Sequence, residues 1–174
     1  FYIKGPYMMA EGVNRNKRIY PLHEMEKEVS RYQKEMVNSG RAMGELNHPT
    51  TADVDLERAC HLVTEMSQDG NVFYGKSKVL STPTGLIVRS LINDGVRVGM
   101  SSRALGQLIP ESGTEGVNRV KDFKLVAIDC VADPSFPKAF VNGILESKQY
   151  VVNKYGQFEE AYDNFEKSIS TLPN

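Results

Sequence analysis

Residues 125–132 restrict the fold of this chain more than any other segment, because they place one carboxylate, Asp129, in the middle of an apolar run. A short run that is apolar at both alternating sets of positions is typical of a strand covered on both faces. A buried carboxylate is unfavourable unless a cation or several hydrogen-bond donors compensate it. The segment therefore predicts an interior strand in which Asp129 has a partner. That partner is either a histidine that the carboxylate orients, or an Arg or Lys in a structural ion pair.

Short elements with strand and helix periodicity alternate along the rest of the chain. Apolar residues at three- and four-residue steps, or a Thr-Pro start signal, predict helices at residues 22–37, 82–94 and 157–172. Strands are predicted at residues 1–10, 58–66, 71–80, 96–102 and 119–132. Asp69-Gly70 predicts a hairpin turn between the second and third of these strands. Many short strands with separated helices are typical of an α+β domain built on an antiparallel sheet or barrel.

The length and charge of the chain limit its classes of partner. A chain of 174 residues suits one domain, 1–174, with the helix at 157–172 as an appendage. Its 21 Lys and Arg are balanced by 22 Asp and Glu, spread evenly, which argues against a nucleic-acid binder. No apolar run approaches the roughly 20 residues of a membrane span.

The cysteines suggest the cellular compartment of the protein, and the first residue suggests that the chain is a fragment. Cys60 and Cys130 are expected to be buried free thiols of a reducing compartment, in a soluble intracellular protein. The chain begins at Phe1 and shows no leader pattern. We therefore expect a processed or engineered fragment.

Ser101 is the first candidate nucleophile. In a strand over 96–102, Val96 and the other apolar residues would face the core, and Ser101 would face the opposite side. Gly99, two residues earlier, would leave an open approach for a substrate carbonyl, which must come within about 3–3.5 Å of the hydroxyl. Ser102 would share the apolar face. Because serines often end strands, the pattern fits a structural serine as well.

The chain has 3 histidines, and they differ in their surroundings. His23 lies at a helix start and is expected to be exposed, whereas His61 follows Cys60 in a strand and is expected to be packed. His48 lies in Gly-Glu-Leu-Asn-His-Pro (44–49), where its ring can face a cleft. The Cys-His pair and one distant histidine lack the spacing of a zinc site, and there is no phosphate-binding glycine motif. We therefore expect no metal and no cofactor, and a Ser–His–Asp hydrolase is one interpretation.

Four motifs resemble, in order and spacing, the prohead (procapsid) proteases of tailed bacteriophages, most closely those of the T-even type. The motifs are Asn-Arg-Asn-Lys-Arg-Ile-Tyr-Pro (14–21), Gly-Glu-Leu-Asn-His-Pro (44–49), Gly-Met-Ser-Ser-Arg-Ala (99–104) and Ile-Asp-Cys-Val-Ala-Asp-Pro-Ser-Phe-Pro-Lys-Ala (128–139). The resemblance implies a serine endopeptidase on an antiparallel β-barrel with flanking helices, similar to the herpesvirus assemblin proteases. It also implies cleavage of scaffold and capsid proteins inside the phage prohead, in the host cytoplasm, before DNA is packaged.

The resemblance assigns the nucleophile to Ser101 and the histidine base to His48. Herpesvirus relatives use a second histidine as third member, and none occurs late in this chain. The corresponding strand offers Asp129, which agrees with the argument from its burial. For the oxyanion donors, the resemblance suggests the backbone around Ser102 and Arg103, or Arg103 holding a water.

The T-even type is expected to cut after a glutamate that has an aliphatic residue two places earlier and a small residue after it. Ile-Leu-Glu-Ser (144–147) fits this pattern, and Ile-Pro-Glu-Ser (109–112) fits it nearly as well. We expect self-cleavage between Glu146 and Ser147, and a weaker site between Glu111 and Ser112, although so loose a pattern also arises by chance. A pocket for the glutamate should contain a cation, and the candidates are Arg97, Arg103 and Lys121.

Two other functions remain open at this point. One is a structural virion protein without catalysis on the same barrel scaffold, as in phage tail-tube proteins. The other is an esterase or amidase of unrelated fold, but Arg103 stands where its Gly-x-Ser-x-Gly motif needs the last glycine. A structural protein would have no reason to bring Ser101, His48 and Asp129 into one cleft. For the protease we expect scaffold and capsid proteins as partners, with no nucleic acid and no membrane, and a homo-oligomer stays open.

Overall fold

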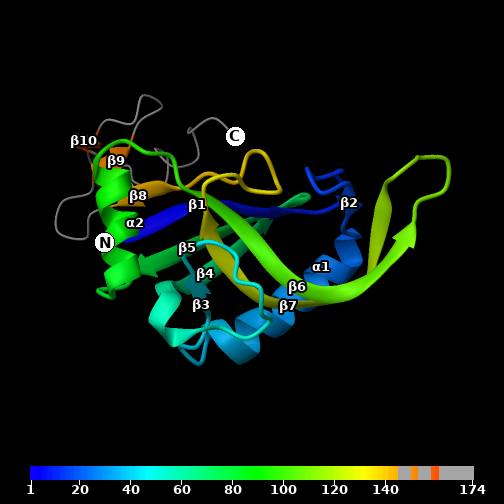
Figure 1. Ribbon diagram of the computed structural model, residues 1–174, viewed down its shortest axis with the longest axis horizontal. Coiled ribbons are helices and arrows are strands. Elements are labelled where there is room, and N and C mark those ends of the chain that lie inside the picture. The colour runs from blue at the N-terminus through cyan, green and yellow to red at the C-terminus, as the bar shows by residue number, and fades with distance from the viewer. Residues whose placement is uncertain (145–149, 153–157, 161–174) are drawn as a thin grey trace.

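The computed structural model describes residues 1–144, 150–152 and 158–160. These residues form two sheets and two α-helices (Figure 1), with the strand orders β10-β9-β8-β1-β5-β4-β3 and β2-β7-β6. The strands are β1 (Tyr2–Met9), β2 (Arg18–Ile19), β3 (Met43–Glu45), β4 (Ala59–Asp69), β5 (Val72–Val79), β6 (Gly99–Pro110), β7 (Asn118–Val131), β8 (Asn142–Ile144), β9 (Tyr150–Val152) and β10 (Phe158–Glu160). The α-helices are α1 (Leu22–Tyr32), which continues as a π-helical turn, η1 (Gln33–Val37), and α2 (Pro83–Asn93); η2 (Leu56–Arg58) is a 3₁₀ turn.

Helix α1 and its π-helical turn confirm the helix predicted over 22–37. The helix buries Met25 and Tyr32 and lies across β7 (Figure 1). Two side chains tie it to the backbone of one residue in that strand. The Glu28 carboxylate accepts a hydrogen bond from the Leu125 N–H at 3.0 Å, and the Arg31 guanidinium donates to the Leu125 carbonyl at 2.8 Å. The polar positions of the helix thus fix its place on the sheet.

The β4–β5 hairpin and α2 also confirm their predictions. Gly70 turns the hairpin with a φ of 59°, a left-handed conformation that glycine adopts without steric cost. Thr82 caps α2, since its hydroxyl accepts a hydrogen bond from the Gly85 N–H at 3.1 Å. None of the helices in the described residues is long and apolar enough to cross a membrane.

The predicted strand at 96–102 begins later than expected and runs further. Strand β6 starts at Gly99, and Val96 is 47% exposed rather than part of the core. The reason is local: the Val96 N–H bonds to the Leu91 carbonyl at the end of α2, so this residue still belongs to the helix exit. Beyond the body of the protein, β6 and β7 continue as a two-stranded ribbon (Figure 1).

The two sheets are joined at two places by short links. Leu46, just after β3, forms a parallel bridge with Cys130 of β7, and Gly99 of β6 forms an antiparallel bridge with Phe140. The Met100 N–H also donates to the Ala139 carbonyl at 2.7 Å. Within the described residues neither sheet closes, so the fold is mixed α/β with antiparallel sheets. The closed herpesvirus-like barrel is not seen in this part of the chain.

The helix predicted over 157–172 falls mostly outside the described residues. Its described part, Phe158–Glu160, forms β10 and pairs with Tyr150–Val152. The prediction of a helix is therefore wrong at its start, because pairing with a neighbouring strand outweighs the local apolar periodicity there. The rest of that predicted helix, residues 161–172, lies outside the described residues.

Candidate active site

The register of β6 and β7 brings the candidate nucleophile to the buried carboxylate. Ser101 lies directly opposite Asp129 in the antiparallel pair. Side chains at such positions point to the same face of a sheet, with β-carbons about 4.5–5.5 Å apart. Ser101 is 4% exposed and Asp129 is fully buried. Two residues far apart in the sequence thus become neighbours in the core of the sheet.

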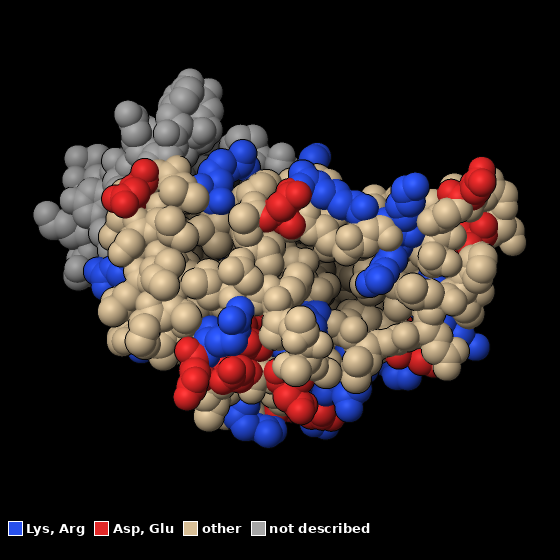
Figure 2. Space-filling model, viewed as in Figure 1, with Lys and Arg blue, Asp and Glu red and all other residues tan. Residues whose placement is uncertain are grey.

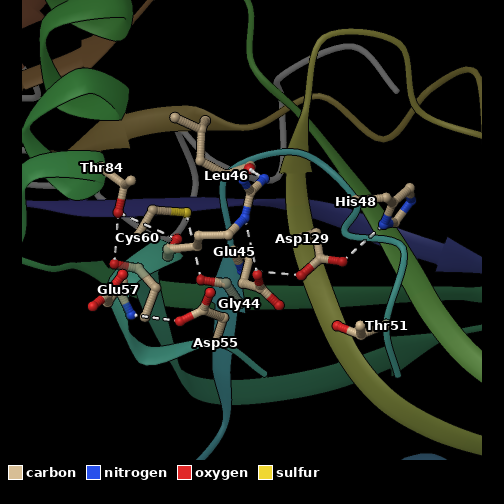
Figure 3. Close-up of polar contacts among 12 residues, drawn as sticks. Gly44, Glu45, Leu46, His48, Thr51, Asp55, Glu57, Cys60, Thr84 and Asp129 are labelled. Carbon is tan, nitrogen blue, oxygen red and sulfur yellow. Dashed lines mark hydrogen bonds and ion pairs between the residues drawn. The ribbon is translucent and has the colours of Figure 1, made fainter. Parts of the chain in front are cut away.

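His48 completes the group from the other sheet. Its Nδ1 lies 2.8 Å from Asp129 Oδ2 (Figure 3), and its side chain is 42% exposed. The loop reaches Asp129 because the Asn47 N–H donates to the Cys130 carbonyl at 2.7 Å. A carboxylate only accepts, so Nδ1 carries the proton and Nε2 is the nitrogen that can accept one.

Asp129 has both of the partners that its burial predicted as alternatives. Besides His48, it accepts a hydrogen bond from Arg103 Nε at 3.1 Å and one from the Glu45 N–H at 2.9 Å. Burial by itself would raise the pKa of this carboxyl. The hydrogen bonds from His48 and Glu45, together with the charge of Arg103, outweigh it and lower the pKa below the usual value. Asp129 is therefore ionised at neutral pH.

Arg103 ties the carboxylate to the loop that follows His48. Its side chain is 10% exposed, and Nη2 donates to Glu45 Oε2 at 2.6 Å. Glu45 is also buried and receives Arg58 Nε at 3.2 Å. Nη1 donates to three carbonyls in the loop, those of Thr51, Ala52 and Asp53 at 3.0, 2.9 and 3.1 Å. The guanidinium is thus directed at the protein itself, which argues against the expected role of Arg103 as an oxyanion donor or water holder.

The surroundings of Ser101 differ from the sequence-based expectation. A β-carbon at Gly99 would lie 2.7 Å from Pro134 Cδ, so the space beside Gly99 is filled and is not an open approach. Ser101 Oγ forms a hydrogen bond with Ser135 Oγ at 3.2 Å. Ser102 is more exposed than Ser101, contrary to its predicted apolar face. Among the described residues, Ser101 makes no hydrogen bond with His48, a contact that often tightens only when substrate is bound.

Sequence reasoning missed Ser135, Glu45 and Arg58. Ser135 and Glu45 lie inside motifs that carried the family resemblance, Asp-Pro-Ser-Phe-Pro and Gly-Glu-Leu-Asn-His-Pro, and this was the available signal. Arg58 is the first residue of the strand predicted over 58–66, and nothing in that pattern marked its side chain as part of a site. Its contact with Glu45 depends on the β3–β4 pairing, which the sequence did not predict.

The residues predicted for self-cleavage and for glutamate recognition lie in different parts of the structure. Glu111 lies at the end of the β6–β7 ribbon, where hydrogen bonds from Arg119, at 2.8 and 3.1 Å, lower the pKa of its carboxyl. Ser112 beside it is exposed, whereas Glu146 and Ser147 lie outside the described residues. Lys121 lies on the ribbon, and the Arg97 guanidinium stacks 4.3 Å from the centre of the Phe140 ring.

An apolar cavity of about 320 Å³ adjoins the segment that carries Ser135. Phe136, Pro137 and Lys138, the next three residues, line it together with Met9 and others. The face of the molecule drawn in Figure 2 carries acidic and basic side chains over a mostly uncharged surface. A lysine is thus placed at the rim of an apolar recess next to the site.

The fold also gathers three buried side chains beneath the site. Cys60, His61 and Cys130 place their ligand atoms within 4.8 Å of one another. Their burial confirms the expectations for both cysteines and for His61. His61 Nε2 donates to the Ile128 carbonyl at 2.7 Å, and desolvation lowers the pKa of its ring to about 4. Three ligand atoms are one fewer than a structural zinc site uses, and we assign no metal here.

Comparison with known proteins identifies the family of this chain. A family model described as "prohead core protein serine protease" matches residues 1–149. The prohead core protein protease of enterobacteria phage T4 is 42% identical over 144 residues, which cover 80% of this chain and 67% of that protein. The solved structure of the bacteriophage T4 capsid assembly protease is similar with a TM-score of 0.70 and 38% identity, covering 75% of this chain and 80% of that one.

Proposed function

The chain belongs to the prohead core protease family and is a capsid-maturation protease; from this premise, we propose that it cleaves by a serine mechanism, with Ser101 as nucleophile, His48 as base and Asp129 as third member. The observation that carries the proposal is the contact of 2.8 Å between His48 Nδ1 and Asp129 Oδ2, on the carboxylate that lies opposite Ser101. A nucleophile, a base and an orienting carboxylate on one face are what acyl transfer needs.

The proposed steps are those of acyl transfer by a serine, a histidine and a carboxylate. His48 Nε2 takes the proton of Ser101 as its Oγ attacks the scissile carbonyl, and the proton then passes to the leaving amine. Asp129 keeps the other ring nitrogen protonated and stabilises the imidazolium. Arg103 acts through Asp129, since its guanidinium binds both the carboxylate and the loop after His48 and so fixes their relative positions. Water then releases the acyl group from Ser101 by the same steps.

We propose that the substrates are scaffold and capsid proteins inside the prohead. The names of the T4 relatives, a prohead core protease and a capsid assembly protease, support this assignment. Cleavage after glutamate remains a prediction. The cavity beside Phe136 and Pro137 is suited to the aliphatic residue two places before that glutamate. Lys138, which also lines this cavity, is then a cation placed to recognise the carboxylate.

The alternative of a structural virion protein is less favoured. Such a protein would not need a half-exposed histidine held by a fully buried carboxylate. Burying two carboxylates, Asp129 and Glu45, around Arg103 costs desolvation energy that apolar residues of similar volume would avoid. The closed barrel that both readings shared stays a prediction.

Labelling with a fluorophosphonate, which reacts with activated serines, tests the mechanism. We expect the wild-type chain to be labelled on Ser101 and to cleave a scaffold-protein substrate. Ser101→Ala should lose both the label and at least about 10³-fold in kcat/KM, while Ser102→Ala keeps the label. Labelling that persists in Ser101→Ala, or that maps to Ser102, would show the nucleophile to be wrong.

A further inference from the structure

Ser135 stands next to the proposed nucleophile and has no role in the mechanism so far. We propose that Ser135 is a positioning residue: its hydroxyl holds Ser101 Oγ in the orientation from which it attacks. This inference rests on the serine mechanism proposed above. It is carried by the hydrogen bond of 3.2 Å between the two hydroxyl oxygens.

That hydrogen bond is significant because Ser101 is buried. With 4% of its surface exposed, the residue depends on protein partners for its hydroxyl. Among the described residues, the hydrogen bond that satisfies it comes from Ser135 alone. A serine side chain has three staggered χ1 wells of similar energy, so one defined partner selects one of them. Without that partner, Ser101 Oγ would spend part of its time pointing away from His48.

Ser135 is itself held rigidly, which a positioning group requires. Its carbonyl accepts a hydrogen bond from the Arg15 N–H at 2.9 Å, and proline rings at 134 and 137 restrict the backbone on either side. Pro134 packs into the space left by the missing side chain of Gly99, 2.7 Å from where a β-carbon would stand. The segment is therefore fastened to β6 two residues before Ser101, and the Ser135 hydroxyl is already in place when substrate arrives.

The direction of the hydrogen bond follows from the proposed chemistry. The Ser101 hydrogen must point to His48 Nε2 in order to be transferred, so in the reacting state Ser135 donates to a lone pair of Ser101 Oγ. Ser135 neither gains nor loses a proton over the cycle. Its effect should thus be confined to the rate of attack, with substrate affinity unchanged.

We would compare Ser135→Ala and Ser135→Thr in the full chain, with Ser81→Ala, an exposed serine, as the matched control. The readouts are kcat and KM on a peptide substrate, the rate constant for inactivation by a fluorophosphonate, and the melting temperature. Ser135→Ala should lower kcat and the inactivation rate constant by about five- to tenfold, the usual range for one lost neutral hydrogen bond. KM should stay as in wild type, and the melting temperature should fall by no more than about 4 °C, the scale expected for one buried hydroxyl that loses its partner. Ser135→Thr, which keeps the hydroxyl, should restore most of the rate.

Two results would overturn the inference. One is an inactivation rate constant of Ser135→Ala equal to that of Ser81→Ala. The other is an equal loss in Ser135→Ala and Ser135→Thr accompanied by a lower melting temperature, which would indicate a packing role. Failure of the serine mechanism is recognised separately, because Ser101→Ala would then remain active. If Ser101→Ala is inactive and Ser135→Ala reacts as fast as Ser81→Ala, the mechanism stands and the positioning role falls.

Discussion

At the scale of single residues, the site depends on how one carboxylate is compensated. Asp129 is fully buried, yet its pKa is lowered, because donors from His48, Glu45 and Arg103 surround it. The histidine and the arginine, which the sequence left as alternatives, are both present. Arg103 compensates the negative charge of the carboxylate, and the carboxylate accepts the hydrogen bond from His48. A structural ion pair and the proposed catalytic pair thus share one acceptor.

Replacing Asp129 by Asn should disturb the orientation of the His48 ring while it keeps the packing of the side chain at position 129. The amide presents a donor where His48 Nδ1–H and Arg103 need an acceptor, which favours the wrong imidazole tautomer. We expect kcat to fall by about 10³–10⁴-fold, the scale of such changes in serine proteases. The matched control is Asp133→Asn, an exposed carboxylate (74% exposed) that pairs with Arg15. Steady-state kinetics should show a change of less than about twofold there; equal losses in both variants would refute the assignment.

His61 should make stability depend on pH in a window of its own. Burial lowers the pKa of its ring from 6.5 to about 4, so the unfolded chain takes up a proton below pH 6.5 while the folded chain does not. This contribution to stability is complete above pH 6.5 and is lost as the pH falls towards 4. Asp129 stays ionised in that window because its pKa is lowered from 3.8.

Urea unfolding at pH 8 and pH 5 measures this effect. In the wild-type chain we expect the histidine to account for a fall of about 2 kcal/mol in the free energy of unfolding. His61→Gln keeps a donor for the Ile128 carbonyl but does not titrate, so its fall should be smaller by that amount. An equal fall in both proteins would mean that His61 is not the group responsible.

At the scale of elements, the contact between β6 and residues 134–138 decides where the hydroxyls lie. Gly99 was expected to admit substrate; the structure uses it to admit Pro134. The bridge from Gly99 to Phe140 and the hydrogen bond from Met100 to Ala139 extend this contact along the strand. The strand that carries the proposed nucleophile is thereby fixed on both edges, by β7 on one side and by this segment on the other.

Gly99→Ala tests this contact. The added methyl group would meet Pro134 and force a shift, so we expect a loss of about 1–3 kcal/mol in stability, as for other overpacked sites, with a fall in activity. Combining it with Pro134→Ala, which removes most of the ring, should cost less than the sum of the two single changes, by about 1 kcal/mol. Urea denaturation of the four proteins gives the coupling energy. Strict additivity would show that the two residues do not contact each other.

At the scale of the whole molecule, the site lies where two sheets meet. His48 follows β3 of the larger sheet, and Ser101 and Asp129 belong to the smaller one. The bridge between Leu46 and Cys130 joins them one residue from Asp129. Activity therefore depends on the sheets docking correctly and not on any one element.

The predicted self-cleavage also has to be tested on the whole chain. Incubation followed by mass spectrometry should give the fragment 1–146, whereas Ser101→Ala stays intact and Glu146→Gln is not cut at this bond. Cleavage between Glu111 and Ser112 should be slower, since it requires release of the Glu111 ion pair with Arg119 at the end of a paired ribbon. Identical fragment maps for wild type and Ser101→Ala would rule out self-cleavage.

The sequence by itself determined the local elements and the candidates for the reactive residues. Apolar periodicity placed α1, the Asp-Gly pair placed the β4–β5 turn, Thr82 placed the start of α2, and the isolated carboxylate in β7 required a partner. These features depend on interactions between residues close in the chain or on the cost of burying one group. They can be inferred before any long-range contact is known.

Only the tertiary structure decided which of these elements and residues contact one another. The register that sets Ser101 opposite Asp129, the docking of Pro134 on Gly99 and the contacts of Arg103 with three loop carbonyls all join residues far apart in the sequence. A one-residue slip in the β6–β7 pairing would turn Ser101 away from Asp129 and leave every local pattern unchanged. For this reason the residue types could be predicted, whereas the hydrogen bond between Ser101 and Ser135 could not.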